Sequence, residues 1–120
     1  MQVFESGLND NGIKNLNLKK LFAWDNKQIT NVNHMVNLEI LNANNSSGID
    51  DYGIKKLNLK ELYANNNPKI TTLNHMTNLQ ILYAIGINCG LNDNGVKNLN
   101  LKKLYTDKNS KIIHYKIPRT

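Results

Sequence analysis

Apolar residues recur along this chain in one short phrase, Leu-x-x-Leu-x-Ala or Thr, which occurs five times. The copies begin at Leu18, Leu38, Leu59, Leu79 and Leu101, at spacings of 20, 21, 20 and 22 residues. In each copy the second Leu and the small residue two places later alternate with outward positions, which is the period of a strand. Strands this short are not stable alone, so we predict parallel stacking in a solenoid. The predicted strands centre on residues 20–24, 40–44, 61–65, 81–85 and 103–107.

A longer period, of 41 and then 42 residues, arises because two unlike halves alternate. Segments 6–29, 47–70 and 89–112 each carry a polar pair shortly before a glycine, and we predict that the pair caps one helical turn. The pairs are Asn9-Asp10, Asp50-Asp51 and Asn92-Asp93, and the inward aliphatic residues are Ile13, Ile54 and Val96. The glycines, Gly12, Gly53 and Gly95, are predicted to allow a close backbone approach or an unusual dihedral angle.

The other segments, 30–43 and 71–84, contain Asn-His-Met and apolar residues spaced three apart. That spacing drifts by about 60° per step on a helix of 3.6 residues per turn, so the apolar residues would not form one stripe. Turns or short 3₁₀ segments are therefore predicted in these halves.

These residues resemble the leucine-rich-repeat family, whose consensus is Leu-x-x-Leu-x-Leu-x-x-Asn-x-Leu. The chain keeps the Asn column at Asn26, Asn67 and Asn109 but departs from it at Ser46 and Ile87. The second strand Leu is replaced by Ala23, Ala43, Ala64, Ala84 and Thr106. The resemblance implies an α/β fold with a single domain over residues 1–120: a short right-handed arc with a parallel sheet on its concave face and turns or short helices on its convex face.

Composition adds limits on size and location. The chain has 120 residues, a net charge of +6 and one Cys, which excludes an internal disulfide framework. No apolar run approaches the roughly 18–20 residues of a membrane span, and the start MQVFESG lacks the features of a signal peptide. We therefore expect an intracellular, cytoplasmic protein. Asn occurs 23 times and Lys supplies 14 of 15 basic residues, which indicates an A/T-rich genome such as that of a protist, a low-GC bacterium or a large DNA virus.

The outward positions of the predicted sheet are rich in aromatic residues. The column between the inward Leu and the small residue reads Phe22, Asn42, Tyr63, Tyr83 and Tyr105, and Trp24 lies beside it. Aromatic anchors on a solenoid face are typical of protein recognition, so the predicted partner-binding residues are Phe22, Trp24, Tyr63, Tyr83 and Tyr105. A Tyr column is also favourable strand chemistry, because aromatic residues stack between neighbouring strands.

The functional expectation is a non-catalytic module that binds an unknown protein partner, without a metal or cofactor. The resemblance also allows a substrate-receptor arm of a ubiquitin-ligase-like assembly. The recurring lysines, most of them in the phrase KNLNLKKL, indicate either a solvated rim or a binder of nucleic acid or an acidic partner. The Lys excess over Arg makes nucleic acid the less favoured partner.

Catalytic and metal chemistry are not indicated. His34 and His75 share one phase but lie two repeats apart, about 10 Å, which is too far for one shared ion. Cys89 replaces a Ser at a turn and has no partner His in the sequence. Asp10, Asp51 and Asp93 follow the long period, so we interpret them as helix caps rather than as a catalytic pair.

Both ends of the repeat array need covering, because terminal repeats expose one side of the core. A short leading strand is predicted over residues 1–5, and the alternating Ile113, Tyr115 and Ile117 predict a final strand in the tail 113–120. We favour a monomer capped by this tail, with an end-to-end dimer as the alternative.

Overall fold

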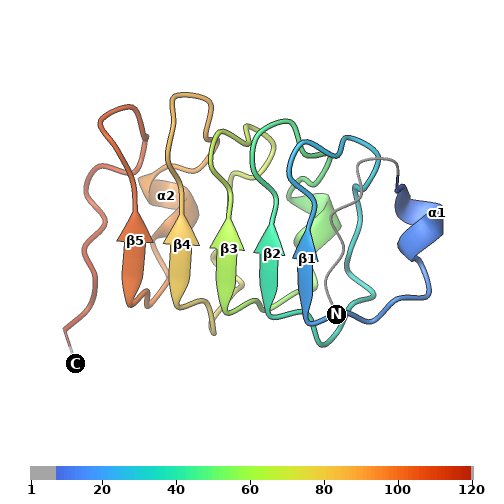
Figure 1. Ribbon diagram of the computed structural model, residues 1–120. Helices are drawn as coiled ribbons and strands as arrows, with labels where there is room; N and C mark the ends of the chain where they lie inside the picture. The colour runs from blue at the N-terminus through green and yellow to red at the C-terminus, as the bar shows by residue number, and fades with distance from the viewer. Residues whose placement is uncertain (1–7, 120) are drawn as a thin grey trace.

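The computed structural model describes residues 8–119 as a solenoid with one parallel five-stranded sheet (Figure 1). The strands follow chain order across the sheet, so each strand pairs with the strand of the next coil. They are β1 (Lys20–Phe22), β2 (Ile40–Asn42), β3 (Glu61–Tyr63), β4 (Ile81–Tyr83) and β5 (Lys103–Tyr105). The predicted parallel stacking is confirmed, although each strand takes only the first three residues of its predicted five-residue segment. The register aligns Leu21, Leu41, Leu62, Leu82 and Leu104 in one row.

A single helical turn lies opposite the sheet in every second coil. These turns are α1 (Asp10–Ile13), the 3₁₀ turn η1 (Tyr52–Ile54) and α2 (Asp93–Val96). The intervening coils make only turns there, as the three-residue apolar spacing predicted. The first member of each polar pair accepts the capping hydrogen bond, from Gly12 N to Asn9 Oδ1, from Gly53 N to Asp50 Oδ1 and from Gly95 N to Asn92 Oδ1.

The second member of each pair does not cap the helix, so our interpretation of Asp10, Asp51 and Asp93 as caps is wrong. Each carboxylate instead accepts hydrogen bonds from the following coil. Asp10 accepts from the backbone of Thr30 and Asn31 and, at 2.5 Å, from the Thr30 hydroxyl. Asp51 repeats this with the backbone and hydroxyl of Thr71 and the backbone of Thr72. These aspartates therefore join coils to one another.

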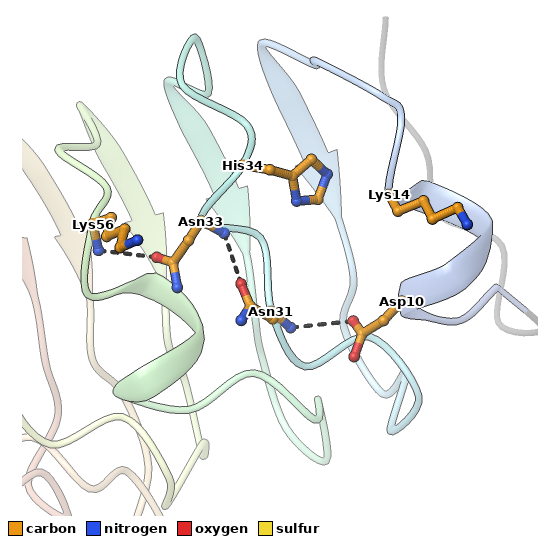
Figure 2. Close-up of a pocket in the computed structure, with 6 residues that line it drawn as sticks. All are labelled: Asp10, Lys14, Asn31, Asn33, His34 and Lys56. Carbon is orange, nitrogen blue, oxygen red and sulfur yellow. Dashed lines mark hydrogen bonds between the residues drawn. The ribbon is translucent and has the colours of Figure 1, made fainter.

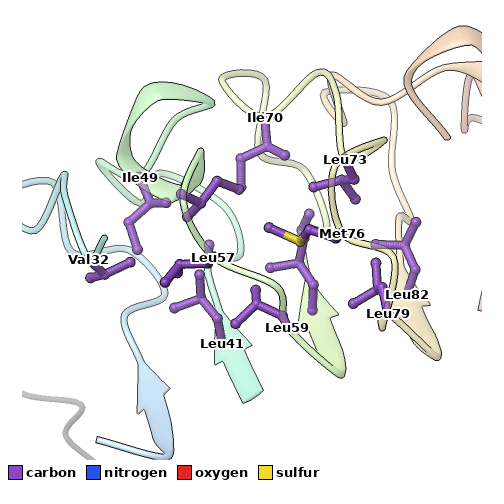
Figure 3. Close-up of a cluster of buried hydrophobic side chains, with 14 of the residues drawn as sticks. Val32, Leu41, Ile49, Leu57, Leu59, Ile70, Leu73, Met76, Leu79 and Leu82 are labelled. Atoms are coloured by element: carbon purple, nitrogen blue, oxygen red, sulfur yellow. The ribbon is translucent and has the colours of Figure 1, made fainter. Parts of the chain in front are cut away.

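The core is a row of aliphatic side chains between the sheet and the turns (Figure 3). The strand leucines Leu21, Leu41, Leu62 and Leu82 are fully buried, as are Ile13, Ile54 and Val96 from the helical turns. Leu104 in β5 is only partly buried, because no further strand covers it. Figure 3 shows contributions from both kinds of half-repeat, such as Leu57 and Met76, meeting in the same interior.

The Asn column is only partly used as the resemblance implied. Asn26 and Asn67 are buried, and Asn67 Nδ2 donates to the carbonyl oxygens of Ala43 at 2.7 Å and Ile49 at 3.2 Å. Asn109 is exposed, and the neighbouring Ser110 is buried in its place. Ser110 Oγ accepts a hydrogen bond from Ile112 N, and the equivalent Ser47 Oγ accepts one from Ile49 N in the second coil.

The tail folds over the last coil without forming a strand, so the strand predicted over Ile113, Tyr115 and Ile117 is wrong. The backbone N–H groups of residues 113–115 all donate to Asp93 Oδ1, which prevents an extended pairing. The Tyr115 hydroxyl donates to Leu99 O at 2.6 Å and accepts from Leu101 N at 3.0 Å. The strand predicted for residues 1–5 lies outside the described residues.

Within residues 8–119, no helix has both the length and the apolar character that crossing a bilayer would require.

Gly12 and Gly53 occupy the same position of the repeat, but only at Gly53 does the preceding coil come close to the glycine Cα. Replacement by alanine should therefore destabilise the fold more at Gly53 than at Gly12. A Cβ at Gly53 would overlap the carbonyl oxygen of Thr30 in the preceding coil. A Cβ at Gly12 would instead lie 3.2 Å from the flexible side chain of Leu8 and 3.5 Å from Asn9 Oδ1. We expect Gly53→Ala to lower the free energy of unfolding by about 2 kcal/mol or more. Gly12→Ala should change it by less than about 1 kcal/mol, since Ala also favours a helix. Urea denaturation of both variants measures the difference, and equal losses would contradict the steric explanation.

The bonds of Tyr115 predict that the tail stabilises the last coil. Tyr115→Phe removes the hydroxyl and leaves Leu99 O and Leu101 N without that partner, so we expect a loss of about 1–2 kcal/mol by thermal or urea unfolding. Deletion of residues 113–120 should cost more and raise aggregation, measured by light scattering. A truncated chain that melts at the wild-type temperature and stays monodisperse would show that the tail is not a cap.

Candidate functional site

The outer face of the sheet, away from the core, carries the predicted binding residues. We call it the outer sheet face. Phe22, Tyr63 and Tyr83 are partly exposed there, and Tyr105 and Trp24 are 39% and 44% exposed. The strand register explains their alignment, because Tyr63 pairs with Tyr83 and Tyr83 pairs with Tyr105 across the ladder.

Three of the five residues form one continuous stack. The ring centroids of Tyr63 and Tyr83 are 4.1 Å apart with an interplanar angle of 7°, and those of Tyr83 and Tyr105 are 4.4 Å apart at 6°. This spacing follows from the short separation of adjacent parallel strands, about 4.8 Å, which brings identical side chains face to face. The rings of the stack therefore present their edges and hydroxyl groups, and not the faces of the middle ring, to a partner.

The other two residues form a separate pair at the opposite end of the sheet. Phe22 and Trp24 have centroids 6.2 Å apart at an angle of 49°. Asn42 stands between Phe22 and Tyr63 in the column, so the aromatic surface is interrupted at β2. The structure thus divides the predicted set into a tyrosine stack on β3–β5 and an aromatic pair at β1.

Aliphatic residues border the tyrosine stack, and the predicted set omitted them. Ile40 and Ile81 precede the strand leucines, Ile85 follows β4, and all three are partly exposed. The column that contains Ile40 and Ile81 has Lys20 and Lys103 at its ends and Glu61 in its middle. The aligned repeats could have indicated these residues, because an Ile at an outward strand position leaves apolar surface exposed to water.

The phenol of Tyr63 is held in its neutral form. Partial burial raises its pKa above the ordinary value of 10.0, and the side chains of Glu61 and Tyr83 raise it further. A neutral hydroxyl next to a carboxylate acts as a hydrogen-bond donor. The stack can thus offer both apolar ring edges and hydroxyl groups for hydrogen bonding, which suits a protein surface.

A polar cleft lies between coils on the helical side, and Asp10, Asn33 and His34 in it already make hydrogen bonds that hold the coils together (Figure 2). Asp10 accepts from Asn31 N, and Asn33 Oδ1 accepts from Lys56 N at 2.9 Å. His34 Nε2 lies 2.9 Å from the carbonyl oxygen of Ile13, which requires a proton on that nitrogen. His75 repeats the contact with Ile54 O at 3.1 Å. The two histidines therefore join each turn to the coil before it.

Within residues 8–119, no group of three or more His, Cys, Asp or Glu side chains is placed to hold a metal ion. Cys89 is buried, and burial raises the pKa of its thiol. A buried thiol with a raised pKa is a poor nucleophile, because the thiolate is the reactive form. The geometry of Cys89 is that of a small apolar residue at a turn.

Comparison of the sequence with protein-family models finds no match, and comparisons with curated proteins and with solved structures find none either.

The carboxylates that join coils predict an acid-sensitive fold. Burial raises the pKa of Asp10, but hydrogen bonds from Thr30 and Asn31 outweigh it, and the resulting pKa lies below 3.8. Hydrogen bonding, chiefly from His114 N, likewise lowers the pKa of Asp93. A pKa depressed in the folded state gives stability that is present above the unfolded pKa and is lost as the pH falls through the folded pKa.

We therefore expect the free energy of unfolding, measured by urea titration, to decrease as the pH falls below about 4. The double variant Asp10→Asn/Asp93→Asn should show a flatter dependence in that range. Asp25→Asn is the matched control, because Asp25 accepts one longer bond, 3.3 Å from Ser46 N. If the double variant keeps the wild-type slope, these two aspartates are not the source of the acid sensitivity.

Proposed function

We propose that this chain is a leucine-rich-repeat protein that binds a protein partner through its outer sheet face, without catalysis, metal or cofactor. The observation that supports the proposal is the tyrosine stack of Tyr63, Tyr83 and Tyr105, bordered by exposed aliphatic residues. In the proposed family this face is the concave one. The repeats with their phrase Leu-x-x-Leu-x-Ala or Thr and the parallel sheet support membership of the family.

A stacked aromatic row is well suited to binding because it is already ordered. Stacking restricts each ring through its neighbours, so these tyrosines lose less side-chain entropy when a partner binds than isolated tyrosines would. Tyrosine also combines apolar area with a hydroxyl, and both are typical of the residues that dominate binding energy at protein interfaces. The stack also stabilises the sheet, so a test has to separate binding from stability.

The stack disfavours nucleic acid as the ligand. Bases bind aromatic side chains by stacking on ring faces. Both faces of the Tyr83 ring are covered, by Tyr63 at 4.1 Å and by Tyr105 at 4.4 Å. Titration with single-stranded DNA and RNA at about 50 mM salt should therefore show no binding, and salt-dependent binding in the micromolar range would favour the nucleic-acid alternative instead.

The decisive experiment selects peptides from a random phage-displayed library on the immobilised full chain, then measures their affinity by fluorescence anisotropy. We expect Tyr83→Ala to weaken binding by about tenfold or more, as for a residue central to an interface. Tyr52→Ala is the matched control, because Tyr52 is 64% exposed and belongs to η1 on the helical side. Thermal unfolding of both variants shows whether the sheet is intact.

Peptides that bind wild type and the triple variant Tyr63→Ala/Tyr83→Ala/Tyr105→Ala equally well would overturn the assignment of this face. Loss of binding by Tyr52→Ala alone would move the site to the helical side.

A further inference from the structure

The outer edge of β5 differs from the same edge of every other strand in the sheet. β1 to β4 are each followed by a strand of the next coil, whereas β5 ends the sheet (Figure 1). Its Leu104 is partly exposed, while Leu21, Leu41, Leu62 and Leu82 are fully buried. One side of the core row is therefore open at this edge.

The four existing strand pairs show which backbone groups a sixth strand would bind. In each pair the carbonyl just before the earlier strand accepts from two N–H groups, that of the residue before the later strand and that of its first residue. For example, Gln80 O accepts from Lys102 N at 2.8 Å and from Lys103 N at 3.0 Å. The residue just after the earlier strand donates to the last residue of the later strand, for example Ala84 N to Tyr105 O at 2.8 Å. On β5 the equivalent groups are Lys102 O and Thr106 N, and no residue from 8 to 119 forms a hydrogen bond with either.

Side chains at this edge also lack the neighbour that earlier coils have. One face of the Tyr105 ring stacks on Tyr83, and no other ring within residues 8–119 stacks on its second face. A cleft of about 520 Å³ lies next to Leu101 and Lys102, with Ile117 and Pro118 of the tail on its other side. In the register of the repeat, a leucine two residues before a sixth strand would enter this cleft.

The charges at this edge indicate which side chains should follow that leucine in an incoming segment. Glu39 and Lys60 occupy the same position in adjacent coils and form an ion pair of 3.1 Å. The same position in the last coil is Lys102, and Lys103 follows it, both exposed. Two acidic residues of an incoming segment would form ion pairs with Lys102 and Lys103. A second copy of this chain would instead bring Lys19 and Lys20 of β1 against them, which is repulsive.

We propose that the edge of β5 is a docking site for an extended segment of a partner protein with the pattern Leu-Glu-Glu-Leu-Tyr, which adds as a sixth parallel strand. Its backbone binds Lys102 O and Thr106 N, its two leucines cover the exposed Ile117 in the cleft and Leu104, and its aromatic ring extends the stack beyond Tyr105. The two glutamates lie opposite Lys102 and Lys103. The site goes beyond the proposed function, because it uses the edge of the sheet rather than its outer face.

The probe is a labelled synthetic peptide, Leu-Asn-Leu-Glu-Glu-Leu-Tyr-Ala-Asn-Asn, measured by fluorescence anisotropy against the full chain. It follows residues 57–66 of this chain with a glutamate in place of Lys60. Lys102→Glu/Lys103→Glu should weaken binding by about tenfold, and a peptide with both glutamates changed to lysine should restore it. The matched control is Lys19→Glu/Lys20→Glu, the equivalent lysines at β1, which should bind the probe as wild type does.

Two N-methylated peptides test the backbone pairing. Methylation of both glutamates removes the two N–H groups that donate to Lys102 O, so binding should fall by about tenfold or more. The leucine that follows has its N–H directed away from β5, because successive residues of a parallel strand alternate in direction, so its methylation should leave binding unchanged. Equal effects of the two methylations would overturn strand addition.

No measurable binding of the unmodified probe, or full binding by the Lys102→Glu/Lys103→Glu variant, would overturn the site. Sedimentation velocity tests the other occupant: a dimer that excess probe dissociates would mean that a second copy covers the edge, and would overturn the partner segment as its occupant.

Discussion

Hydrogen bonding between successive coils is the interaction on which the rest of this structure depends. Each coil has a strand of three residues and at most one helical turn, so few backbone groups find partners within the coil itself. Side chains supply the remaining bonds across the coil boundary. Asp51 binds the turn of the next coil, His75 binds the carbonyl of the previous one, and Asn67 binds two buried carbonyls. Buried polar groups left without such partners would cost about 1–3 kcal/mol each.

This dependence changes the meaning of the Asn-rich composition. The amide of Asn can donate and accept at once, which suits a position between two coils. Asn33 donates to Tyr52 O and accepts from Lys56 N, and Asn65 Oδ1 accepts from Ile85 N. The high asparagine content therefore has a structural role: several of the asparagines join adjacent coils.

The same repetition that joins the coils also creates the candidate binding surface. The spacing of adjacent strands places Tyr63, Tyr83 and Tyr105 face to face, and this spacing alone accounts for their alignment. The stack ends where the sheet ends, at the open face of Tyr105 beside the unpaired edge of β5. The proposed docking edge and the proposed binding face therefore adjoin at Tyr105.

The sequence by itself determined the parallel sheet, its register, the inward leucines and the aromatic column, because the same phrase recurs every 20–22 residues and equivalent positions of its copies align on neighbouring strands. It did not determine the roles of Asp10, Asp51 and Asp93 or the path of the tail. A cap and a bond to the next coil require the same residue types, and only the stacking distance decides which donor is nearer. In the tail, alternation suggested a strand, but Asp93 binds three consecutive N–H groups, which an extended strand cannot present to one oxygen.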